Sequence, residues 1–241
     1  MITLCLDFGN SRKKGVLFNN DVIIQEFIFQ DTLNEIEKII AEHAPSRCIL
    51  SSVIEKDPAI EELLSKKSDY HKLSSESKLP FTMAVSKKET VGADRLALLA
   101  AAVRFHHGKN SLVISLGSCI TYNFINQENI FLGGSISPGM DMRFRAMHEY
   151  TTLLPLAKTS FNIPFTGYDT ITNLQSGVIH GMIAELDGII LKYAEKYGNF
   201  NVVLTGGNST YFAGQLKYRI FADLNFLFKG LYALSEINYR N

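Results

Sequence analysis

A short acidic and glycine-containing segment near the start of the chain has the residue types of a phosphate-binding turn. The segment Asp7-Phe8-Gly9-Asn10-Ser11-Arg12-Lys13-Lys14 follows an apolar run, residues 2–6, and precedes a second one. Glycine permits a turn whose backbone N–H groups face an anion, and a carboxylate beside it can hold a metal ion or water. An ordinary β-hairpin with Asp and Asn as turn residues explains the segment taken alone.

The same pattern recurs 108 positions later, where an apolar run leads into Ser115, Gly117 and Ser118. Ser115 aligns with Asp7 and Gly117 with Gly9 (115 − 7 and 117 − 9). Two equivalent turns, one in each half, predict a duplicated domain with a nucleotide in the cleft between the halves.

A third candidate site lies at the start of a predicted helix. The Ala- and Leu-rich run 96–105 has high helix propensity, and Gly108 suits its end. Asp94 there is explained by the helix dipole, whereas Arg95 is less expected and hints at an anionic ligand. Two interpretations stay open: helix-entry chemistry, or Asp94 as a general base and Arg95 as a carboxylate contact.

The composition restricts the partners and the compartment. Lys plus Arg and Asp plus Glu both number 24, so the net charge favours neither nucleic acid nor an anionic membrane. Cys5, Cys48 and Cys119 are odd in number and widely spaced, without a zinc-binding pattern. The longest uninterrupted apolar run, 96–103, is too short to span a bilayer, and the first residues lack the features of a signal peptide. We therefore expect a reduced cytoplasmic protein.

Hydrophobic periodicity predicts an α/β fold of two halves, residues 1–110 and 111–241. We expect strands in 2–6, 16–18, 22–29, 48–54, 112–116, 120–125, 130–136, 200–205 and 222–228, and helices in 32–40, 59–67, 96–105, 140–150, 171–197 and 230–237. The polar segment 68–88 reads as a surface loop with one short strand, and 151–169 as a loop or lid. The apolar stripe of 171–197 leaves room for a partner helix at a dimer interface. Gly206 and Gly207 follow the end of a strand. They either allow a nucleotide base or ribose to approach the backbone, or they only form the connection between this strand and a helix.

Together these motifs resemble the type III pantothenate kinase family of the acetate kinase, sugar kinase, Hsp70 and actin superfamily. The matching pieces cover nearly the whole chain in the family's order and are residues 7–12, 92–95, 117–121, 133–139 and 204–207. The resemblance implies two ribonuclease H-like (actin-like ATPase) domains, a nucleotide cleft and a homodimer. It also implies transfer of the ATP γ-phosphoryl group to the primary hydroxyl of pantothenate, the first step of coenzyme A synthesis.

The resemblance assigns roles residue by residue. Residues 7–14 correspond to the first phosphate loop, with Asp7 near the magnesium-bound phosphates, and Asp94 corresponds to the catalytic base. Ser118 corresponds to the second phosphate loop, and Gly206 and Gly207 correspond to the adenosine side of the nucleotide site. The pantothenate contacts correspond to Phe81, Gly92, Ala93, Asp94 and Arg95. Thr170 corresponds to a residue that reaches the substrate across the dimer.

Two positions depart from the family pattern. The second loop of the family begins and ends with Asp, and here Ser115 and Asn123 stand in those places. The family associates these positions with the catalytic cleft and with a potassium or ammonium ion, so weakened metal handling or a slower reaction is expected. A slow kinase, a nucleotide- or pantothenate-binding pseudoenzyme with a regulatory role, and another small-molecule kinase of the superfamily are the alternatives.

Overall fold

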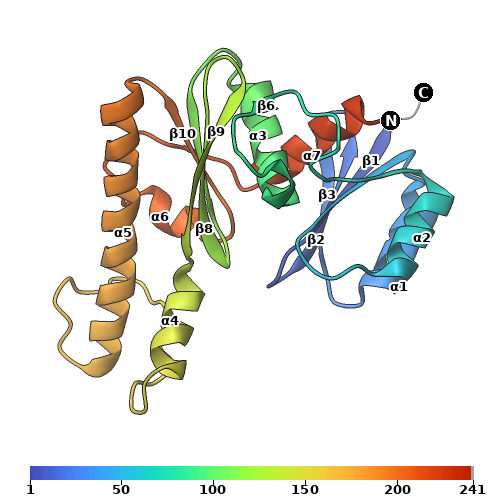
Figure 1. Cartoon of the computed structure of the whole chain (residues 1–241). Coiled ribbons are helices and arrows are strands. Elements are labelled where there is room, and N and C mark those ends of the chain that lie inside the picture. The colour runs from blue at the N-terminus through green and yellow to red at the C-terminus, as the bar shows by residue number, and fades with distance from the viewer. Residues whose placement is uncertain (240–241) are drawn as a thin grey trace. The chain divides into compact units, whose positions relative to one another are not determined.

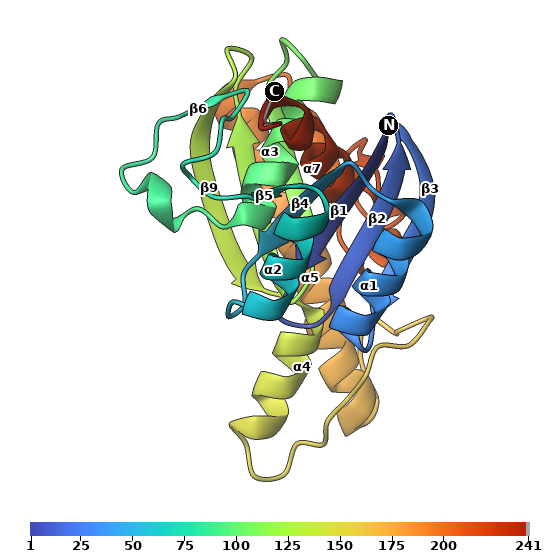
Figure 2. The same ribbon diagram turned by 90° about the vertical axis from the view of Figure 1, so that its right-hand side faces the viewer.

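The computed structural model describes residues 1–239, which divide into two compact units (Figures 1 and 2). The first unit holds residues 1–108, the segment 125–133 and the C-terminal segment from Asn225. The second holds residues 109–124 and 134–224. The expected boundary at 110/111 therefore lies close to the first crossing of the chain between units, but two later segments return to the first unit.

The first unit is built on a five-stranded sheet in the order β3-β2-β1-β4-β5. Its strands are β1 (Ile2–Phe8), β2 (Lys13–Asn19), β3 (Val22–Phe29), β4 (Arg47–Ser52) and β5 (Asp69–Lys72). Strand β1 runs antiparallel to β2 and parallel to β4. The phosphate-type turn thus joins two central strands of the sheet.

Side-chain alternation along β1 gives its two faces different neighbours. Leu4, Leu6 and Phe8 point to the face where α1 (Thr32–His43) and α2 (Pro58–Lys67) pack (Figure 2). The opposite face is covered by α3 (Ala93–Phe105) and α7 (Phe226–Ile237), which pack closely on one another. Because Asp7 is out of phase with Leu6 and Phe8, its side chain belongs to the face that α3 covers.

The second unit repeats this strand order. Its sheet is formed by β7 (Ser111–Leu116), β8 (Cys119–Ile125), β9 (Ile130–Pro138), β10 (Asn201–Thr205) and β11 (Phe221–Ala222), although the last residue of β8 and residues 130–133 of β9 are assigned to the first unit. They lie in the order β11-β10-β7-β8-β9, which is the order of the first sheet read from its other edge. The duplication inferred from the two turns is therefore present in the topology. The short strand β6 (Thr82–Met83) pairs with Ile130 and Phe131 at the start of β9, which belong to the first unit as β6 does.

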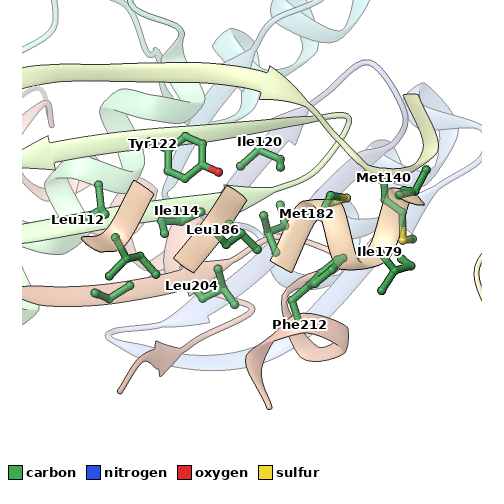
Figure 3. Close-up of a cluster of buried hydrophobic side chains, with 14 of the residues drawn as sticks. Leu112, Ile114, Ile120, Tyr122, Met140, Ile179, Met182, Leu186, Leu204 and Phe212 are labelled. Carbon is green, nitrogen blue, oxygen red and sulfur yellow. The ribbon is translucent and has the colours of Figure 1, made fainter. Parts of the chain in front are cut away.

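The core of the second unit lies between this sheet and α5 (Thr170–Tyr197), with α4 (Met140–Glu149) and α6 (Ser209–Ala213) at its margins. Figure 3 shows Leu186 of α5 beside Ile114 and Leu204 of the sheet, and Ile179 near Met140 of α4. Within residues 1–239, α5 is the one helix whose length and composition would suit a membrane span. Its packing in this core accounts for that apolar composition.

Most predicted elements are confirmed, and two were wrong. Residues 222–228 are not a strand, because β11 ends at Ala222 and α7 begins at Phe226. A Cβ at Gly230 would lie 1.8 Å from the Ala97 carbonyl oxygen, so glycine at this position allows α7 to pack closely against the backbone of α3. The polar segment 68–88 contains the edge strand β5 in addition to β6, and a 3₁₀ turn (Lys88–Thr90) begins at its last residue.

Candidate active site

The first phosphate-type turn is a compact loop that closes on its own backbone. The Gly9 N–H donates to the Arg12 carbonyl at 3.1 Å, and the Lys13 ammonium lies 5.2 Å from the centroid of the Phe8 ring. The loop borders a hollow of about 480 Å³, of the size typical of small-molecule sites. The hollow is lined by Gly9, Asn10, Ser11, Arg12, Lys13, Ile28, Phe29, Gln30, Thr32 and Ile54.

Asp7 is held by its neighbour in the sheet. The parallel register of β1 and β4 places Asp7 opposite Ser51, and the buried Ser51 hydroxyl donates to Asp7 Oδ1 at 3.0 Å. The pKa of Asp7 is raised to about 6, chiefly by burial and in smaller part by the nearby Asp94 carboxylate. The Ser51 hydrogen bond and Lys14 act in the opposite direction. The carboxylate is therefore only partly protonated near neutral pH.

The second carboxylate, Asp94, lies in the first turn of α3. Gly92 precedes that turn, and a Cβ on it would lie 2.5 Å from Asp94 Oδ1, so a side chain at position 92 would displace the carboxylate. Burial raises the pKa of Asp94, against opposing interactions with the backbone and side chain of Arg95. Asp7 and Asp94, 87 positions apart in sequence, thus belong to one electrostatic cluster.

The neighbouring cation, Arg95, is placed over an aromatic ring. Its guanidinium carbon lies 5.6 Å from the centroid of the Phe131 ring at the start of β9. Strand β6 pairs with this same part of β9, with Met83 opposite Phe131. Phe81, the aromatic residue expected in the substrate pocket, immediately precedes β6 and is buried.

The second turn has tight backbone packing on two sides. A Cβ at Gly139 would lie 2.2 Å from the Gly117 carbonyl oxygen, and the Gly139 N–H donates to the Ser118 carbonyl at 3.1 Å. A Cβ at Gly206 would lie 2.6 Å from the Leu116 carbonyl oxygen, and its φ of 91° also favours glycine. The structure therefore brings the second turn together with the Gly206-Gly207 turn, as the nucleotide interpretation requires.

The two positions that depart from the family pattern have different surroundings. Ser115 is opposite Thr205 in the parallel register of β7 and β10, as Asp7 is opposite Ser51 in the first unit. Asn123 is fully buried in β8 and its amide donates to the Val113 carbonyl and to Thr121 Oγ1, at 3.3 and 3.2 Å. A carboxylate has no proton to donate to these oxygens, so this hydrogen bonding is specific to asparagine.

Thr170 stands apart from the other predicted residues of the second unit. It is the exposed first residue of α5, directly after the N-cap Asp169. Asp169 and Thr172 form a reciprocal capping box that fixes this helix start.

Sequence reasoning missed two residues of the candidate site, Ser51 and Phe131, and it did not name the residues that Gly139 approaches. Ser51 and Phe131 are remote in sequence from the carboxylate and the arginine that they contact. Gly139 belongs to a glycine-rich motif, but its close approach to the second turn requires the return of the chain after β9. The available signal for Ser51 was a hydroxyl at the end of a strand, in a place equivalent to Asp7.

The donor atoms suit some ions better than others. Within residues 1–239, no group of three or more His, Cys, Asp or Glu side chains is arranged to hold a metal ion. Magnesium does not need such a group, because one or two carboxylates plus substrate phosphates and water complete its coordination. Asp7 beside the first turn fits that mode.

Comparison with solved structures defines the class of protein. A Campylobacter jejuni protein described as a Baf family transcriptional activator matches with a TM-score of 0.61 and 20% identity, over 97% of both chains. Component A of (R)-2-hydroxyglutaryl-CoA dehydratase from Acidaminococcus fermentans matches with a TM-score of 0.53 and 12% identity, over 98% of this chain and 96% of that one. These likenesses and the duplicated topology define an actin-like ATPase and sugar kinase fold.

Sequence comparison defines the family within that class. The sequence model of type III pantothenate kinase matches residues 3–192. The type III pantothenate kinase of Christiangramia forsetii is 36% identical over 98% of this chain and 99% of its own, and that of Bacteroides fragilis is 34% identical over 100% and 99%. The chain belongs to the type III pantothenate kinase family.

Proposed function

We propose that this protein transfers the γ-phosphoryl group of ATP to the primary hydroxyl of pantothenate. The observation that carries the proposal is the pairing of Asp7 at the end of β1 with Asp94 at the start of α3. The relatives named above as pantothenate kinases supply the substrate. Both carboxylates are present here, as expected of an enzyme that retains its chemistry.

Asp94 acts as the general base in the proposed reaction. The hydroxyl oxygen of pantothenate forms a bond to the γ-phosphorus while the bond from that phosphorus to the ADP oxygen breaks, and the hydroxyl proton passes to Asp94. Burial raises the pKa of Asp94, which makes its carboxylate a better proton acceptor. The rest of the catalysis is positioning and charge neutralisation by the two turns.

Magnesium would be held by Asp7, through water, and by the phosphates, and it would neutralise charge on the triphosphate. A potassium or ammonium ion fits this chain less well. Ser115 brings no charge to the second turn, and Asn123 brings an uncharged amide whose nitrogen donates to the Val113 carbonyl. We therefore propose that activity here does not require a monovalent cation.

We also propose a cytoplasmic homodimer. Five large apolar side chains in 150–168 are between 80% and 90% exposed: Tyr150, Leu153, Phe161, Phe165 and Tyr168. So many exposed apolar side chains in one segment are typical of a protein interface. A second copy of the chain is the proposed partner, and Thr170 follows this segment directly. Sedimentation of the wild type against Phe161→Ser/Phe165→Ser tests it: a monomeric wild type would refute the dimer.

The enzymatic proposal is tested by following phosphopantothenate formation with ATP and magnesium, with and without potassium. Asp94→Asn removes the proton acceptor and leaves the fold unchanged, so the rate falls about 10²- to 10⁴-fold. Nucleotide binding measured by calorimetry stays within about twofold of wild type. If the wild type binds ATP but forms no product, the chain is a binding protein without turnover and the kinase proposal is wrong.

A further inference from the structure

Phe131 is a fully buried aromatic residue with a charged neighbour. It is 1% exposed and lies at the start of β9, and Arg95 of α3 lies over its ring at 5.6 Å. Aromatic rings attract a guanidinium through the negative potential of their faces, and this distance lies within the range of about 6 Å in which the attraction matters. The ring therefore limits the positions that the guanidinium can take.

The ring is itself fixed by the surrounding backbone. Strand β6 pairs with β9 so that Met83 is opposite Phe131, and the Ala84 N–H donates to the Phe131 carbonyl at 3.0 Å. The charged group facing Arg95 from α3 is Asp94, whose carboxylate interacts with it. Arg95 thus lies between an aromatic face on one strand and an acidic group on its own helix.

From this geometry we infer that Phe131 is a positioning residue that holds the Arg95 guanidinium for the carboxylate of the substrate. The inference rests on the proposed function, because pantothenate carries a carboxylate at the end remote from its reacting hydroxyl. A guanidinium held in place loses less conformational freedom when it binds a carboxylate. Phe131 thereby determines the preference for a carboxylate-bearing substrate over an uncharged one.

The test compares two substrates, pantothenate and its primary amide, in which an uncharged carboxamide replaces the carboxylate. The quantity measured is the ratio of kcat/KM for the acid to kcat/KM for the amide. In Phe131→Leu this ratio falls roughly threefold to tenfold, since leucine fills part of the volume but offers no aromatic face. A general loss of stability lowers both values together and leaves the ratio unchanged.

Phe18→Leu is the matched control, because Phe18 is also 1% exposed and its ring stacks on Tyr232, away from Arg95. In Phe18→Leu the ratio of kcat/KM for the acid to kcat/KM for the amide stays at the wild-type value. In an Arg95→Met background, where the guanidinium is absent, Phe131→Leu lowers the ratio no further. Phe131→Met, which keeps more of the buried volume, provides the same measurement if the leucine variant does not fold.

An unchanged ratio in Phe131→Leu or Phe131→Met overturns the inference, and so does a further fall in the Arg95→Met background. A wild type that phosphorylates neither compound refutes the proposed function instead. The two failures are therefore distinguishable in one set of assays.

Discussion

Replacement of Asp7 by asparagine is expected to stabilise the folded protein at basic pH, although Asp7 belongs to the proposed active site. Asp7 has a pKa of about 6 in the folded chain, against 3.8 for an unperturbed aspartate, chiefly because of burial. The folded state therefore binds the proton more tightly than the unfolded state. Above pH 6 the ionised carboxylate destabilises the fold, and this cost decreases as the pH falls toward 3.8.

The magnitude follows from the two pKa values. The difference between 3.8 and about 6 corresponds to roughly 3 kcal/mol at 1.36 kcal/mol per pKa unit. Asparagine is neutral, and its carbonyl oxygen can still accept the Ser51 hydrogen bond. We expect Asp7→Asn to raise the free energy of unfolding by roughly 1–3 kcal/mol at pH 8, and the gain to disappear near pH 4.

Urea unfolding of wild type and Asp7→Asn at pH 8 and pH 4 measures this difference directly. Glu37→Gln is the control, because it removes one negative charge from an exposed position on α1 of the same unit. Its effect at pH 8 stays within about 0.5 kcal/mol. A destabilised Asp7→Asn at pH 8, or an equal gain at both pH values, would refute the reasoning from burial.

Three further variants probe the two turns. Ser51→Ala removes the hydrogen bond that favours the ionised form of Asp7, so the acidic limb of the pH–rate profile moves to higher pH by about one pH unit. Ser52→Ala is the control, because the Ser52 hydroxyl donates to a backbone carbonyl at 3.3 Å, and it leaves the acidic limb in place. Asn123→Asp buries a carboxylate against carbonyl and hydroxyl oxygens, so thermal unfolding shows a loss of about 3 kcal/mol or more, and a variant as stable as wild type would contradict this. Gly139→Ala places a Cβ 2.2 Å from a carbonyl oxygen of the second turn, so calorimetry shows ATP binding weakened by about tenfold or more. Gly214→Ala is the control, because an added Cβ there has no other atom within 4 Å, and it leaves ATP binding unchanged.

The local patterns of the chain predict its elements well wherever one physical rule dominates. The apolar run 2–6, the helix expected in 59–67 and the apolar stripe of 171–197 all correspond to observed elements. The Asp57 carboxylate accepts from the Ile60 N–H, as its N-cap position predicts. The helix predicted at 230–237 is confirmed, but prediction failed at the start of α7, where the aromatic and aliphatic run from Phe226 is helical because α7 packs on α3.

The sequence by itself determined the duplicated pattern and the family. Two turns 108 positions apart, and a carboxylate beside an arginine at a helix start, are properties of the sequence, and the reaction was expected from the family that these motifs together resemble. The boundaries of the units depended on the fold, since α7 packs on the first unit although it follows the second in the chain.

Only the tertiary structure decided which residues act on one another. Sheet register made Ser51 the partner of Asp7, and β9 carried Phe131 beneath Arg95. The pKa of Asp7 depends on burial and on a carboxylate 87 positions away, and no local pattern records either quantity. Hydrogen bonds, ring contacts and desolvation act over a few ångströms in space, so residues distant in sequence meet only once the chain has folded.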